Sequence, residues 1–216
     1  METLAGLRAA LAGVPQGGWL DDGLRRVAAE PGAIVREFAA AGRRSGRDPL
    51  PGWPDWTADE AARVLLLAAL PPAQTLTQVE SLYRYGDAAE KRAVLWALPE
   101  LPVGDGAVPL LHDAIRTNDT RLVAAALGGY ARHLDQAAWR QAVLKCVFMG
   151  VPLAQVHDLN ARADGELAIM LAGLAQEPTA AGRELPADAT ALLARLGAVD
   201  PNHAPPTRAV GRPTEP

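Results

Sequence analysis

The sequence contains very little cysteine and few aromatic residues. One cysteine, Cys146, occurs among 216 residues, which excludes an intramolecular disulfide and fits a reducing compartment such as the cytoplasm. Aromatic residues make up 5% of the chain, and alanine and leucine dominate its apolar part instead. Because these two residues favour helix over strand, the composition predicts an all-α protein.

Long apolar runs and dense blocks of one charge are also missing. The longest apolar run, residues 64–70, is far shorter than the roughly 20 residues of a membrane-spanning helix. The N-terminus has no basic region followed by an apolar segment, so we expect no secretory signal. The net charge of −4 is spread along the chain, without the density of Lys and Arg that a nucleic-acid groove needs. We therefore expect a cytoplasmic protein that binds no nucleic acid and has no transmembrane segment.

Helix start and stop signals recur through the chain. Side chains typical of helix N-caps precede four apolar segments: Thr57 (with Glu60), Asp87 (with Glu90), Asp119 and Asp135. The segments between these signals are short, so each helix must stack on its neighbours to bury its apolar face. Alternation of apolar and polar residues is absent over any useful length, and we expect no sheet.

The middle of the chain is expected to form pairs of helices like those of HEAT repeats. Apolar residues recur at helical spacing over residues 87–127, with a turn around Asn118. In a HEAT-type junction an Asp in the turn commonly pairs with a nearby Arg, and here these would be Asp119 and Arg121. No strict period runs through the whole chain. The sequence therefore predicts an irregular stack of helical hairpins, an α-α superhelix, rather than a regular array.

Composition divides the chain into one helical domain, residues 1–197, and a tail. The domain comprises an N-terminal helical piece (1–44), a proline-rich connector (45–56) and a helical stack (57–197). We expect residues 45–55 of the connector not to pack. Residues 198–216 lack an apolar pattern and carry several prolines, which predicts a disordered tail.

Histidine and cysteine do not have the spacing of a metal site. The four histidines are His112, His133, His157 and His203. None has the close paired spacing of zinc ligands, and we expect no metal and no cofactor. Cys146 lies in an apolar helical stripe, where a free cysteine usually packs as a small hydrophobic side chain. The alternative is an enzyme in which Cys146, Lys145 and His157 converge in one pocket for nucleophilic and acid–base chemistry.

The densest polar cluster runs from His157 to Glu166. Arg162 and Glu166 stand four residues apart, so they are expected to pair on one helix face. Asn160 is the expected N-cap of that helix. The alternative interpretation is that these side chains line a groove for a small molecule.

Several short segments in the second half of the chain resemble the EboA family. They are residues 118–122 (NDTRL), 134–139 (LDQAAW), 143–146 (VLKC) and 150–153 (GVPL), of which the last two, taken together, are the most specific. Residues 162–163, 166–167 and 180–183 fit the same pattern. The sequence departs from it near residues 174–179, where Pro178 stands in place of an aromatic and basic stretch.

The resemblance implies a bacterial protein of secondary metabolism that takes part in metabolite traffic. Its partners would be proteins encoded in the same gene cluster, a small-molecule metabolite, or both. We expect a non-catalytic helical scaffold or binding protein for an isoprenoid-like or cyclitol-like compound. The alternative is an enzyme acting on such a compound with Cys146, Lys145 and His157 in its pocket.

Six polar residues are the expected contacts to the ligand or partner: Asp119, Arg121, Lys145, His157, Arg162 and Glu166. A peripheral membrane contact is a further possibility, because Leu4, Leu7 and Leu11 form an apolar stripe near the N-terminus. The simpler interpretation of that stripe is that it belongs to the core.

Overall fold

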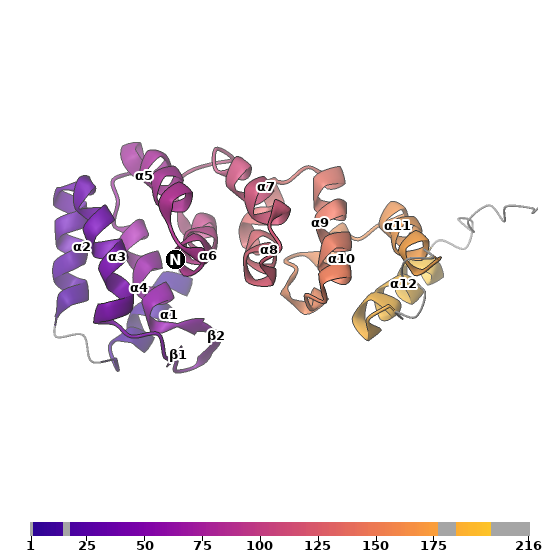
Figure 1. The fold of residues 1–216 in the computed structure, drawn as a ribbon, viewed down its shortest axis with the longest axis horizontal. Coiled ribbons are helices and arrows are strands. Elements are labelled where there is room, and N and C mark those ends of the chain that lie inside the picture. The colour runs from indigo at the N-terminus through magenta and orange to yellow at the C-terminus, as the bar shows by residue number, and fades with distance from the viewer. Residues whose placement is uncertain (1, 15–17, 177–184, 200–216) are drawn as a thin grey trace, which may run out of the picture.

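A computed structural model describes residues 2–14, 18–176 and 185–199 of the chain. In these residues twelve α-helices follow one another in an elongated stack (Figure 1). The first six are α1 (Glu2–Leu11), α2 (Trp19–Ala29), α3 (Ile34–Arg44), α4 (Ala58–Ala68), α5 (Pro72–Tyr85) and α6 (Ala88–Ala97). The others are α7 (Val108–Arg116), α8 (Thr120–Ala126), α9 (Gln136–Met149), α10 (Leu159–Arg162), α11 (Gly165–Gln176) and α12 (Ala187–Val199). The all-α prediction is confirmed.

Four short 3-10 helices lie between them: η1 (Pro31–Ala33), η2 (Leu98–Glu100), η3 (Gly129–His133) and η4 (Leu153–Gln155). Consecutive helices of the middle part, α7 with α8 and α8 with α9, pack against each other. Their kinship to HEAT repeats stays a prediction. Residues 200–216 of the predicted tail and residues 180–183 of the family-like pattern lie outside the described residues.

Helix α4 is the central helix of the N-terminal half. Every residue from Ala58 to Leu67 is buried, and the helix packs against α1, α3 and α6. Leu7 and Leu11 of α1 are fully buried as well, so the N-terminal leucine stripe belongs to the core. None of the helices in the described residues is long and apolar enough to cross a membrane.

Four of the five predicted N-caps are confirmed. The residues that occupy the expected position are Thr57, Asp87, Asp119 and Asp135. In the first of these caps the amide of Thr57 donates to Oε2 of Glu60 at 3.1 Å. This backbone N–H would otherwise have no acceptor, because no helical turn precedes it. Gly150 ends α9 in the left-handed conformation, with φ 73°, that glycine adopts without steric cost.

The expectation of no sheet and an unpacked connector is wrong for residues 49–57. Strands β1 (Pro49–Leu50) and β2 (Trp53–Thr57) pair antiparallel in a small hairpin. Leu50 is 1% exposed, because the hairpin folds onto the helices rather than away from them. The sequence does not reveal these strands, since they are too short to show alternation and contain prolines.

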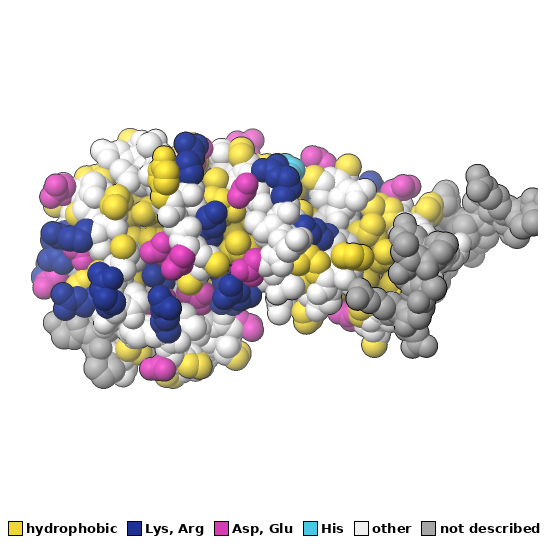
Figure 2. Space-filling model, viewed as in Figure 1, with side chains coloured by type: hydrophobic (Ala, Val, Ile, Leu, Met, Phe, Trp, Pro, Cys, Tyr) yellow, Lys and Arg dark blue, Asp and Glu magenta, His cyan; other side chains and the backbone are white. Residues whose placement is uncertain are grey.

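On the face shown in Figure 2, basic and acidic side chains are interspersed over the N-terminal helices. The most deeply buried pair of charges lies inside this half. Arg63 and Asp59 of α4 form an ion pair in which each side chain is 2% exposed. Nε of Arg63 also donates to the carbonyl of Phe38 on α3 at 3.2 Å. The guanidinium therefore joins two helices within the core.

We expect Arg63→Ala to lower the free energy of unfolding by about 3–5 kcal/mol, because it leaves the Asp59 carboxylate buried without its partner. Urea denaturation followed by circular dichroism measures this change. Arg116→Ala is the matched control, since Arg116 is 72% exposed and its removal should cost less than about 0.5 kcal/mol. The double variant Asp59→Leu/Arg63→Met should recover part of the loss. Equal losses in the Arg63 variant and the control would contradict the assigned role.

Candidate functional site

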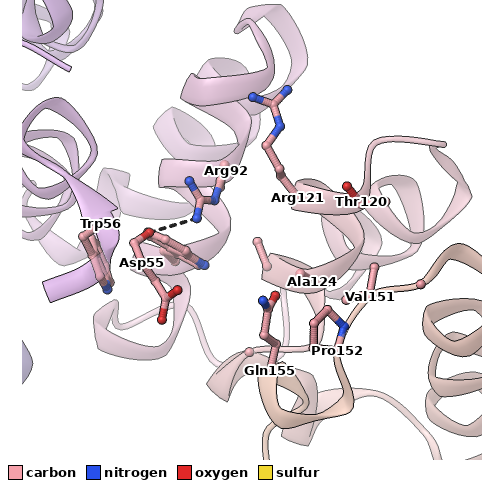
Figure 3. Close-up of a pocket in the computed structure, with 13 residues that line it drawn as sticks. Asp55, Trp56, Arg92, Thr120, Arg121, Ala124, Val151, Pro152 and Gln155 are labelled. Atoms are coloured by element: carbon pink, nitrogen blue, oxygen red, sulfur yellow. Dashed lines mark hydrogen bonds between the residues drawn. The ribbon is translucent and has the colours of Figure 1, made fainter. Parts of the chain in front are cut away.

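A groove with a volume of about 420 Å³ lies between two parts of the chain that are far apart in sequence (Figure 3). One wall comes from the end of the hairpin and from α6, and contains Asp55, Trp56, Arg92 and Trp96. The opposite wall comes from α8 and from the segment that follows α9. The volume of the groove is within the range of about 300–1,000 Å³ that is usual for small-molecule sites.

The first wall is an aromatic stack. The rings of Trp56 and Trp96 lie 4.2 Å apart, centroid to centroid, and are tilted by 43°. Trp53 meets the Trp56 ring edge-on at 6.0 Å, and the Arg92 guanidinium lies 3.9 Å from the centroid of Trp96. These contacts hold the hairpin against α6 and give the groove a rigid side.

Arg92 is fixed in this wall by two hydrogen bonds. Its Nη1 donates to Oε1 of Glu60 at 2.8 Å, and its Nη2 donates to the backbone carbonyl of Asp55 at 2.9 Å (Figure 3). The Glu60 side chain is 4% exposed, so the anion that holds Arg92 lies in the core. Arg92 thus connects α4, α6 and the hairpin at the groove.

The opposite wall is built mainly from small residues: Ala124, Ala125, Gly128, Gly150, Val151 and Pro152. Polar side chains at its edge are Thr120, Arg121 and Gln155. Arg121 forms a bidentate pair with Asp119, with Nε–Oδ1 3.1 Å and Nη2–Oδ2 2.7 Å, as predicted from the sequence. This hydrogen-bonded pair lowers the pKa of Asp119 and raises the pKa of Arg121.

Comparison with known proteins identifies the family. The model of the family described as metabolite traffic protein EboA matches residues 38–193. The chain belongs to the EboA family. The match confirms the resemblance seen in the second half of the chain and extends it to the hairpin, α4 and α6. All residues of the groove lie within the matched region.

This family membership associates the chain with metabolite traffic. No curated protein and no solved structure gives a significant match to it.

The polar residues expected as contacts do not form one site in this EboA family member. Arg121 lines the groove and Asp119 holds it. The amine of Lys145 instead donates hydrogen bonds to the carbonyls of Ile115 and Thr117, at 2.5 and 2.7 Å. It thereby pairs backbone carbonyls at the C-terminal end of α7 that have no partner within the helix. Glu166 is exposed on α11 and is not part of the groove.

The expected pairing of Arg162 with Glu166 is wrong. Arg162 ends α10, and Glu166 lies in the separate helix α11 because the chain leaves the helical conformation at Ala163. The Arg162 guanidinium donates to the carbonyls of Ala131 and Leu134, at 2.7 and 2.9 Å. It is a bridge between helices rather than a member of a surface pair.

The N-cap expected at Asn160 is also wrong. Asn160 lies inside α10, and Asp158, in the left-handed conformation with φ 55°, precedes that helix. Asn and Asp tolerate this conformation better than other residues with a Cβ. The cap position is therefore displaced by two residues from the one predicted.

The three residues of the alternative enzyme hypothesis each lie in a different environment. Cys146 is fully buried, and burial raises the pKa of its thiol to about 12, so the thiol stays protonated. The Lys145 amine is occupied by backbone carbonyls. His157 is exposed, with Nδ1 3.1 Å from Oδ2 of Asp158. Within the described part of the chain, no three His, Cys, Asp or Glu side chains lie close enough together to hold a metal ion.

We expect Cys146 in the folded protein to react with a disulfide reagent such as Ellman's reagent only when the protein unfolds, because the thiolate is absent and the sulfur is inaccessible. The absorbance of the released thiolate, recorded at pH 8 with and without urea, measures the reaction. Because Cys146 is the only cysteine, Cys146→Ala gives the blank. Rapid reaction of the folded protein would instead support an activated thiol.

Asp164 ties α11 to α9 through a set of hydrogen bonds. Its carboxylate accepts from Nη2 of Arg140 at 2.6 Å, from Nε2 of Gln136 at 3.1 Å and from the amide of Leu167 at 3.1 Å. The bonds from Arg140, together with those from the Leu167 amide and Gln136, lower the pKa of Asp164 to about 2 against the opposing effect of burial. The charged form of Asp164 is thus the one that the fold stabilises.

Since the folded pKa lies below the ordinary value of 3.8, the contribution of Asp164 to stability is complete above about pH 4 and is lost as the pH falls through 2. We expect Asp164→Asn to lower the free energy of unfolding at pH 7 by about 1–2 kcal/mol. The variant should also lose less stability than the parent between pH 4 and pH 2. Urea denaturation at a series of pH values tests both effects. Asp22→Asn, which removes a 51% exposed carboxylate, is the control and should change neither.

The residues of the aromatic wall were not recognised as a site from the sequence. Trp53 and Trp56 lie in the proline-rich connector, and Trp96 falls within the apolar helical pattern of residues 87–127, so no local pattern relates them. The spacing of Arg92 and Trp96, four residues apart on α6, allows the guanidinium to lie over the indole, but many helices have such pairs. Only the packing of the hairpin on α6 turns them into one wall.

Proposed function

We propose that this chain is a non-catalytic binding protein of a metabolite-processing pathway, and that the groove between the hairpin and α8 holds the metabolite. The observation that carries the proposal is the pairing of a rigid aromatic wall with a wall of small residues, a shape that accepts a flat small molecule. Its aromatic and guanidinium groups are held in place by the core before any ligand arrives. Such preorganisation lowers the entropic cost of binding.

The candidate ligand is an isoprenoid-like or cyclitol-like compound, as the family resemblance implies. The proposal includes delivery of the compound to a partner protein encoded in the same gene cluster, for which the helical stack would act as the scaffold. An enzyme that uses Cys146, Lys145 and His157 is the less favoured alternative. A buried protonated thiol and an amine bound to carbonyls are poor starting points for nucleophilic chemistry.

Native mass spectrometry of the protein purified from its own host tests this function. We expect a small molecule to be retained by the wild-type chain and its occupancy to fall at least tenfold in Ala124→Trp, because the new ring would fill the groove from α8. Ala39→Trp is the matched control, since Ala39 lies on an exposed position of α3 away from the groove. It should retain the compound at the wild-type level.

Retention of the compound by Ala124→Trp would place the ligand elsewhere and would overturn the proposed site. An empty chain that carries a second protein would favour a purely structural scaffold. Circular dichroism of both variants establishes that any loss of ligand is not a loss of fold.

A further inference from the structure

The charges around the groove are unusual, because both of its cations are already neutralised. Arg92 is paired with the buried carboxylate of Glu60, and Arg121 is paired through two hydrogen bonds with Asp119. Arg121 also has a raised pKa as a result of this pair. Two arginines in a groove would ordinarily indicate an anionic ligand such as a phosphate. Here neither guanidinium has uncompensated charge to offer.

The carboxylate of Asp55, in contrast, has no partner among the described residues. Only its backbone carbonyl is used, as the acceptor for Arg92. Figure 3 shows the carboxylate turned away from Arg92. Counted with their buried or paired counterions, the charged groups of the groove leave one negative charge, that of Asp55. An anion entering the groove would meet repulsion there rather than attraction.

The remaining polar groups are uncharged and also free. The hydroxyl of Thr120 and the amide of Gln155 have no hydrogen-bond partner in the part of the chain that the structure describes, and both line the wall opposite Asp55. A hydroxyl and an amide can each donate and accept, whereas a carboxylate only accepts. Hydroxyl groups of a ligand, which donate and accept at once, match all three.

We propose that the groove selects an uncharged, hydroxyl-rich ligand and discriminates against its phosphorylated counterpart. Asp55 accepts hydrogen bonds from ligand hydroxyls, and Thr120 and Gln155 bind hydroxyls from the opposite wall. The edges of Trp56 and Trp96 contact the apolar side of the ligand. The proposal rests on the proposed function and narrows the class of metabolite. A cationic amine would pair with Asp55, but it can only donate hydrogen bonds and would leave the donor groups of Thr120 and Gln155 without an acceptor, which makes hydroxyls the better match.

Two probes with a common phenyl ring test the selectivity: phenyl β-D-glucopyranoside, which is neutral and hydroxyl-rich, and phenyl phosphate, which is anionic. Their dissociation constants are measured by tryptophan fluorescence excited at 295 nm, since two tryptophans line the groove. We expect the glucoside to bind at least tenfold more tightly than the phosphate. Binding of the glucoside should be lost in Ala124→Trp, which shows that the fluorescence reports on the groove.

Asp55→Asn should reduce the ratio of the two dissociation constants at least threefold, because the glucoside binds more weakly and phenyl phosphate binds more tightly. Asp48→Asn is the matched control, because Asp48 is an exposed carboxylate just before the same hairpin and does not line the groove. It should leave both dissociation constants unchanged. Equal effects of the two variants would overturn the role given to Asp55.

Phenyl phosphate binding as tightly as the glucoside would overturn the proposal, as would tighter binding of benzylamine, a cationic probe with the same ring. Failure of every probe to bind would also overturn it. Native mass spectrometry of the compound retained from the host distinguishes these outcomes from a failure of the proposed function. If Ala124→Trp loses that compound, the groove is the binding site and only the ligand class is wrong.

Discussion

Helix α4 brings three charged side chains into the core, and the N-terminal half is organised around the partners that these charges require. Burying an unpaired charge is so unfavourable that each must meet an opposite charge or a complementary hydrogen-bond donor or acceptor. Arg63 meets Asp59 on its own helix and a carbonyl on α3. Glu60 meets Arg92 on α6 and the amide that begins its own helix. Apolar packing brings these helices together, and the charges decide how they are placed against one another.

The groove is a consequence of the same arrangement. Arg92 is held at the surface end of the network by Glu60, and there it covers Trp96 and binds the end of the hairpin. The hairpin in turn contributes Trp56 and Asp55 to the wall. A binding surface on the outside of the protein is therefore positioned by a carboxylate inside it. The aromatic wall of the groove is thus anchored directly to the core.

The sequence predicted what depends on neighbouring residues and did not predict what depends on distant ones. The caps at Thr57, Asp87, Asp119 and Asp135 and the pair of Asp119 with Arg121 are local, and all are confirmed. The hairpin was missed because its stability comes from the packing of Leu50 and the tryptophans on helices elsewhere in the chain. Of the expected contact residues only Arg121 lines the groove, because the groove joins four segments that no local pattern relates.

Gly150 has two functions that place different demands on one position. As the residue that ends α9 it must adopt a left-handed backbone, and as part of the groove it keeps the wall thin. Apart from its neighbours in the chain, no residue has an atom within 4 Å of the place where its Cβ would be, so there is open space for a side chain. The backbone, with φ 73°, is what disfavours one. The requirement of the helix end for glycine therefore also leaves this part of the groove wall without a side chain, whatever the groove binds.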